Sequence, residues 1–291
     1  MVSSYFEGTI ELPGAQEFAI SPDGRVIVVC VPSSGEVVIV NAADGLVAKR
    51  LSVQGRARSV IFSSDKSRAY IDFVDRNIIL ELSASDWSKV RDIPLSVYQM
   101  LASKNPFSAY AMSGLDFQEF DLGDNPQVKK TLALYFRPNR RALSREGNHA
   151  GVSDGSFINV IDLLGWSKVS VNAFRGGDVL ALNSGGSHLY VSSAPNDWVQ
   201  VHDLINKKVI AELDGRATAA ALTPNNSHAF IVAAIGAKMT VVDIENNHEV
   251  VDDITVGGAP NSVAVNANGS HVYLTNGSVL KVLRTNRWST K

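Results

Sequence analysis

One short pattern returns seven times along the chain, and this repeat limits the possible folds more than any other feature. Each copy begins with an apolar pair followed by a small polar residue, which we call the anchor. The anchors are separated by 42, 40, 41, 39, 40 and 43 residues and are Ser21, Ser63, Ser103, Ser144, Asn183, Thr223 and Asn266. So regular a period indicates repeated supersecondary units, each of which packs on its neighbours.

Every copy predicts short β-strands. Seven residues after the anchor, five copies carry an aromatic residue, whereas Val28 and Gly151 are the exceptions. A later apolar run often ends in aspartate, as in 158–162, 199–203 and 240–243. The runs are rich in β-branched and aromatic residues, and Gly, Pro, Asn and Asp separate them. No segment has a helical apolar period, so each copy predicts a four-stranded antiparallel sheet.

Such sheets have two apolar faces, and packing them around a central axis covers both faces. The seventh copy supplies only three strands, around 262–265, 271–275 and 279–283. The segment 5–12 matches the fourth-strand pattern of the other copies. We therefore predict an all-β, seven-bladed β-propeller that forms one domain over residues 1–291. Its N-terminal strand should complete the last blade and cover two exposed sheet edges.

The repeat also resembles a known family. The segments 188–192, 241–244, 257–265 and 271–276 resemble the YVTN-type β-propeller repeat, and the resemblance covers about residues 5–284. The third and fourth copies depart from it at Phe107 and Gly151. Proteins of this kind include surface-layer components, periplasmic binding or scaffold propellers, and propellers related to lactonases and amine dehydrogenases. The resemblance thus implies a fold but no single function.

Composition excludes several classes of partner. The formal net charge of −2 gives no reason to expect a nucleic acid, and no apolar run is long enough to span a membrane. The start does not read as a signal peptide, so we expect a cytoplasmic protein, or a periplasmic or secreted one if a signal was removed. Cys30 is the only cysteine, which excludes an internal disulfide and a Cys-rich zinc site. We expect a monomer without a cofactor.

Arginines concentrate in the loops that join the fourth strand of one blade to the first strand of the next. These loops should line the mouth of the central channel, and their arginines are Arg56, Arg58, Arg137, Arg140, Arg175 and Arg216. A guanidinium suits carboxylate and phosphate groups. The pattern predicts a binding or scaffold propeller whose mouth binds an anionic small molecule or an acidic segment of a partner protein. Alternatively, each arginine pairs with a nearby carboxylate or faces water.

Trp198 should lie in a loop on the same face. There it would either stack on the ligand or cover the edge of its own blade.

A second function class uses the same mouth. Glu17, Asn139, Asp178 and Asn261 fall four or five residues before their anchors. Oxygen ligands of this type suit calcium, so the alternative is a propeller hydrolase, lactonase or lyase with a calcium site. The chain contains no phosphate-binding glycine loop, nucleophile elbow or dinucleotide fingerprint. We therefore favour a non-catalytic protein and assign no catalytic residue.

Two other residue types recur. Histidine stands five residues after the anchor in four successive copies, at His149, His188, His228 and His271. Equivalent points on adjacent blades are too far apart to share one metal ion, so we predict local hydrogen bonds. Trp87, Trp166 and Trp288 are expected in outer hairpins, where they either pack on the blade or form a docking rim.

Overall fold

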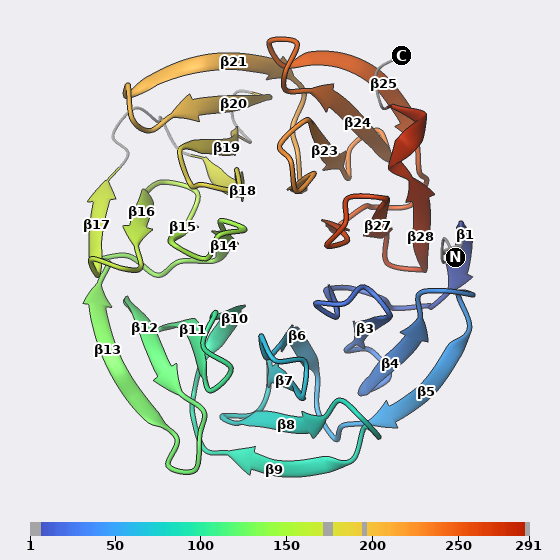
Figure 1. The fold of residues 1–291 in the computed structure, drawn as a ribbon, viewed down its shortest axis with the longest axis vertical. Helices are drawn as coiled ribbons and strands as arrows, with labels where there is room; N and C mark the ends of the chain where they lie inside the picture. The colour runs from blue at the N-terminus through green and yellow to red at the C-terminus, as the bar shows by residue number, and fades with distance from the viewer. Residues whose placement is uncertain (1–6, 171–176, 194–196, 289–291) are drawn as a thin grey trace. The chain divides into compact units, whose positions relative to one another are not determined.

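The chain folds as seven four-stranded antiparallel sheets, the blades of a seven-bladed β-propeller (Figure 1). The computed structural model describes residues 7–170, 177–193 and 197–288. The only helix within these residues is the 3-10 turn Thr285–Arg287, so no described helix is long and apolar enough to cross a membrane. The predicted all-β class and blade number are confirmed.

The strands follow the repeat in order. Blade 1 contains β2 (Phe18–Ile20), β3 (Val26–Val31), β4 (Glu36–Asn41) and β5 (Val47–Ser52). Blade 2 contains β6 (Ala57–Phe62), β7 (Arg68–Phe73), β8 (Ile79–Ser83) and β9 (Lys89–Ile93). Blade 3 contains β10 (Tyr98–Ala102), β11 (Ser108–Ser113), β12 (Asp116–Asp121) and β13 (Gln127–Ala133).

The remaining blades repeat this order. Blade 4 contains β14 (Arg140–Leu143), β15 (His149–Ser153), β16 (Ile158–Asp162) and β17 (Ser167–Ser170). Blade 5 contains β18 (Asp178–Leu182), β19 (His188–Ser193), β20 (Trp198–Asp203) and β21 (Lys208–Asp214). Blade 6 contains β22 (Ala219–Leu222), β23 (His228–Ala233), β24 (Lys238–Asp243) and β25 (Glu249–Thr255). Blade 7 contains β26 (Ser262–Val265), β27 (His271–Thr275), β28 (Val279–Arg284) and β1 (Gly8–Glu11).

The N-terminal strand completes the last blade, as predicted. Strand β1 runs antiparallel to β28, with Gly8 opposite Val282 and Glu11 opposite Val279. Beyond the strand, Leu12 N donates to Ser278 O over 2.8 Å. The edge of β28 is therefore paired with chain from the opposite end of the sequence, which removes an edge open to other strands.

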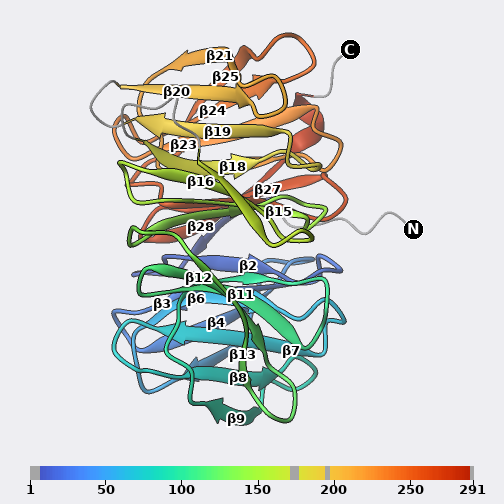
Figure 2. The ribbon, with the colours of Figure 1, turned by 90° about the vertical axis from the view of Figure 1, so that its left-hand side faces the viewer.

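By its contacts the chain divides into two compact units, residues 1–133 with 266–287 and residues 134–265 with 288–291. Inside each unit the apolar core lies between the facing sheets of successive blades. In the first unit Cys30 and Phe73 share the core of blades 1 and 2. In the second, Val179 and Leu189 pack in the core of blades 4 and 5, and Tyr190 lies in the core of blades 5 and 6. Figure 2 shows β18, β19, β20 and β21 side by side within blade 5.

The anchor explains why the repeat is so regular. In six blades the anchor side chain accepts a hydrogen bond from the backbone N–H five residues later, over 2.9–3.0 Å. The anchor N–H donates to the carbonyl of that same residue. These two bonds close the first hairpin of each blade. Blade 3 differs, because Ser103 Oγ accepts from Asn105 N instead.

Replacing one anchor tests this account. We expect Thr223→Val to lower the free energy of unfolding by about 1–3 kcal/mol, because it leaves the buried His228 N–H without its side-chain acceptor. Thr223→Ser keeps the hydroxyl and should lose less. Urea unfolding measures both. Unchanged stability in Thr223→Val, or a larger loss in Thr223→Ser than in Thr223→Val, would contradict the role of the hydroxyl.

Candidate functional site

Arg58 lies in a buried junction of blades 2 and 3. Its side chain is 16% exposed and its Nη2 lies 2.7 Å from Oδ2 of Asp72, which is 1% exposed. The same guanidinium donates to Val97 O over 2.8 Å and lies 4.2 Å from the centre of the Tyr98 ring. Asp72 also accepts from Ser59 N and Gln99 N. The guanidinium of Arg58 is thus bound by groups of both blades and links blade 2 to blade 3.

Arg56 and Arg140 each have one carboxylate neighbour and remain partly open to solvent. Arg56 N donates to Asp75 Oδ1 over 2.9 Å, and Arg56 Nε lies 3.4 Å from Asp75 Oδ2. The backbone hydrogen bond holds the pKa of Asp75 below its usual value. Arg140 Nε lies 3.7 Å from Asp178 Oδ2, and both side chains are about half-buried. These contacts match the alternative in which arginines pair locally.

Arg137 and Arg216 differ from these three arginines. Both are exposed. Neither forms an ion pair or a side-chain hydrogen bond within the described part of the chain. Both belong to the second unit and stand seven residues before their anchors. Arg175 lies outside the described residues.

The residues considered for calcium are divided between the units. Glu17 belongs to the first unit, whereas Asn139, Asp178 and Asn261 belong to the second. Asn139 is exposed, and Asp178 directs one oxygen toward Arg140. Over residues 7–170, 177–193 and 197–288, no three His, Cys, Asp or Glu side chains are grouped so that they could hold a metal ion.

The tryptophans pack on the blades where their contacts are described. Trp198 is half-buried and packs on the core between blades 4 and 5. Trp87 meets Phe62 edge to face at 6.3 Å. Trp288 meets Phe230 at 5.3 Å and donates from Nε1 to Asp252 Oδ2 over 2.8 Å. Trp166 is half-buried.

The repeated histidines make the local hydrogen bonds that the repeat predicts. In each case Nδ1 lies 2.8–3.1 Å from a polar side chain of the same hairpin, with His149 beside Asn148, His188 beside Asn183, His228 beside Ser227 and His271 beside Ser270. These hydrogen bonds stay within each blade, although His149 also lines a pocket toward the next blade.

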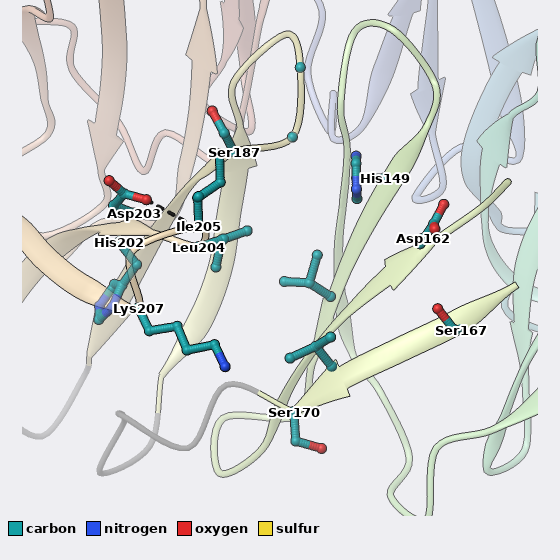
Figure 3. Close-up of a pocket in the computed structure, with 14 residues that line it drawn as sticks. His149, Asp162, Ser167, Ser170, Ser187, His202, Asp203, Leu204, Ile205 and Lys207 are labelled. Carbon is teal, nitrogen blue, oxygen red and sulfur yellow. Dashed lines mark hydrogen bonds between the residues drawn. The ribbon is translucent and has the colours of Figure 1, made fainter. Parts of the chain in front are cut away.

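A pocket of about 560 Å³ lies between blades 4 and 5, and the sequence did not reveal it (Figure 3). One wall is the outer part of blade 4, where Val160 and Val169 lie beside Asp162 and Ser167. The opposite wall comes from two hairpins of blade 5. They contribute Gly186, His202, Leu204, Ile205 and Lys207. The pocket therefore combines an apolar interior with a few charged groups, as ligand sites commonly do.

The two carboxylates of the pocket are held by their own turns. Asp162 Oδ1 accepts from the N–H groups of Leu164 and Gly165. Asp203 Oδ1 accepts from Ile205 N and Asn206 N, and Oδ2 accepts from the Asn206 side chain. The hydrogen bonds from Asn206 hold the pKa of Asp203 below its usual value. Both groups thus serve the turn between third and fourth strands.

The cationic and imidazole groups of the pocket have different surroundings. Burial lowers the pKa of His202 to about 4, and its Nε2 lies 3.1 Å from Gln200 Oε1. Its ring is therefore neutral at pH 7. Lys207 is exposed and forms no ion pair with any described residue. Its side chain extends toward the strand that carries Ser170 (Figure 3).

Comparisons with known proteins identify the fold. No family model and no curated protein matches the chain. Among solved structures, the chain is similar to one titled Kuenenia stuttgartiensis hydrazine synthase, with a TM-score of 0.79 and 16% sequence identity. The match covers 94% of this chain and 96% of that chain. At this identity the similarity shows a shared β-propeller fold and nothing about activity.

The arginine environments predict unequal costs of substitution. Arg58→Met leaves Asp72 as a buried carboxylate without its cation, so we expect the free energy of unfolding to fall by about 3 kcal/mol. Arg56→Met breaks only an exposed pair and should lower the free energy of unfolding far less than Arg58→Met does. Urea unfolding compares the two. A similar small loss in both variants would contradict a structural role for Arg58.

His202 predicts a pH dependence of stability. Between pH 6.5 and about 4 the unfolded imidazole binds a proton that the folded one does not. The contribution of His202 to stability is therefore complete above pH 6.5, falls with pH through this window and levels off below it. We expect the melting temperature of the wild type to fall more steeply here than that of His202→Leu. Parallel curves would contradict this assignment.

Proposed function

We propose that the protein is a non-catalytic binding or scaffold propeller whose fourth-to-first-strand loops bind an anionic small molecule or an acidic segment of a partner. The observation that supports this is the state of Arg137 and Arg216. Each is exposed and has no carboxylate partner among the described residues, although both stand at the same register position of their repeats. Arg58 is left out of this site, because Asp72 and Val97 already hold its guanidinium.

The chemistry follows from the neighbours of each arginine. A guanidinium that lacks a protein carboxylate keeps its paired N–H donors available for a phosphate or carboxylate ligand. Arg140 is half-exposed and 3.7 Å from Asp178, so a ligand would compete for it with a carboxylate that is already present. A ligand would likewise compete with Asp75 for the guanidinium of Arg56. Arg137 and Arg216 should therefore provide most of the attraction for an anion.

A matched pair of double variants tests the proposal. Citrate or inorganic phosphate at about one hundred times its dissociation constant should raise the melting temperature of the wild type by about 4 °C. We expect the variant Arg137→Gln with Arg216→Gln to lose this rise. The control, Arg25→Gln with Arg50→Gln, changes the net charge equally but alters a hairpin of blade 1 and the outer strand β5. It should keep the rise.

The remaining outcomes decide against the proposal. If both double variants lose the stabilisation, the effect depends on net charge, and no anion site exists at these loops. Poly-glutamate serves as the probe for an acidic partner, and its failure together with citrate and phosphate would overturn the proposal. A rise with calcium that a chelator reverses would instead favour the hydrolase or lyase alternative with a calcium site.

A further inference from the structure

Within each unit, successive blades meet through a row of three side chains on the sheet face that is turned to the next blade. The row starts at the residue seven after the anchor and continues through its cross-strand partners on the third and fourth strands. In blade 2 it is Tyr70, Glu81 and Arg91. In blade 4 it is Gly151, Val160 and Val169. The outer end of the row faces the hairpin that joins the third and fourth strands of the next blade.

In blades 1 and 2 a basic residue at the outer end of the row binds that next hairpin. Lys49 Nζ donates to Asp86 O over 2.8 Å. Arg91 Nη2 donates to Leu122 O and Gly123 O, each over 2.7 Å. The space between these pairs of blades is thereby bridged by the protein's own side chains.

In blades 5 and 6 an aromatic ring fills the same space. The ring of His248, from the hairpin of blade 6, lies 6.0 Å from the ring of Tyr190 in the row of blade 5. The Trp288 indole covers Phe230 and binds Asp252, and both of these residues belong to the row of blade 6. A ring at this place is thus a normal part of the architecture.

Within the described residues, blade 4 has none of these contacts to the next blade. Gly151 replaces the aromatic residue of the row, and the Cβ of any other residue there would lie 3.0 Å from Val179 Cγ1. At the outer end, Val169 is too short to reach the next hairpin and is 62% exposed. That hairpin presents Lys207, whereas the hairpins of blades 2 and 6 present Trp87 and His248. All three residues have a left-handed backbone, with φ of 54°, 62° and 61°.

We propose that the pocket between blades 4 and 5 is a second binding site, and that it takes a planar aromatic molecule bearing one carboxylate. The aromatic body would lie between blades 4 and 5, against Val160, Val169 and Leu204. This space corresponds to the one that the His248 ring fills between blades 5 and 6. Ile205, 75% exposed, would cover its outer side. Covering Val169 and Ile205 is favourable because both side chains are exposed to water.

Lys207 selects the carboxylate. Its ammonium lines the pocket and has no ion-pair partner among the described residues. Asp162 and Asp203 also line the pocket, but the N–H groups of their own turns bind one oxygen of the first and both oxygens of the second. The anionic group of a ligand would therefore meet Lys207, on the wall opposite Asp162.

Methyl NMR titration tests the proposal with 2-naphthoate and its neutral analogue, naphthalene-2-methanol. Naphthoate should shift the methyl signals of Val160, Val169, Leu204 and Ile205, and should bind about fivefold more tightly than the alcohol. Lys207→Gln should bind both compounds equally. The control is Lys208→Gln, which makes the same charge change one residue along, outside the pocket lining, and should keep the preference.

A third variant tests the location. Lys207→Trp places at this hairpin the residue that blade 2 has at Trp87, so it should fill the pocket and abolish binding of both probes. Circular dichroism would verify its fold. Three results would overturn the proposal: naphthoate leaves the four methyl signals unmoved, Lys207→Gln keeps the preference, or naphthalene-2-methylammonium binds more tightly than naphthoate. The variant of Arg137 and Arg216 should bind naphthoate normally, so the two sites are tested separately.

Discussion

A single hydrogen-bonded ring, formed by the anchor and the residue five positions later, sets the geometry of six blades. The N–H of the later residue donates to the anchor side chain and would lose this acceptor if that side chain were apolar. Leaving such a buried donor unpaired costs about 1–3 kcal/mol. A serine, threonine or asparagine is therefore required at a position that is otherwise surrounded by core, as the buried Ser144 and Asn266 illustrate. Because this requirement recurs in six blades, the polar anchor recurs along the sequence with the period of the blades.

Once each first hairpin is closed in the same way, the differences between blades lie in the side chains that face the next blade. Arg91 of blade 2 binds two carbonyls of blade 3, and Tyr190 of blade 5 packs beside His248 of blade 6. Blade 4 retains its strand pairing but has Gly151 and two valines in that row. At Gly151 the next blade already fills the space, because a Cβ there would lie 3.0 Å from Val179 Cγ1. The pocket lies farther out along the row, where Val160 and Val169 line it.

Much of the fold could be predicted from the sequence because it depends on local patterns. The anchors, the aspartates that end third strands and the four-strand alternation all act within one repeat, and the structure has these strands. The closing strand was predicted over 5–12, and the described pairing covers Gly8–Glu11. The closure itself was predictable because the last copy lacks a strand that the first residues can supply.

The site was less predictable because it depends on partners from other strands and blades. Arg56 and Arg58 are two residues apart, Arg56 in a loop and Arg58 in β6, and Arg58 is buried against Asp72 and Val97 whereas Arg56 stays exposed. Gly151 is visible in the sequence as a departure from the repeat. The pocket could not be predicted from it, because the pocket depends on the register that pairs Val160 with Val169 and on the hairpin of the next blade that carries Lys207. A repeat gives every blade the same frame, so specific binding has to come from positions where one blade differs from the others.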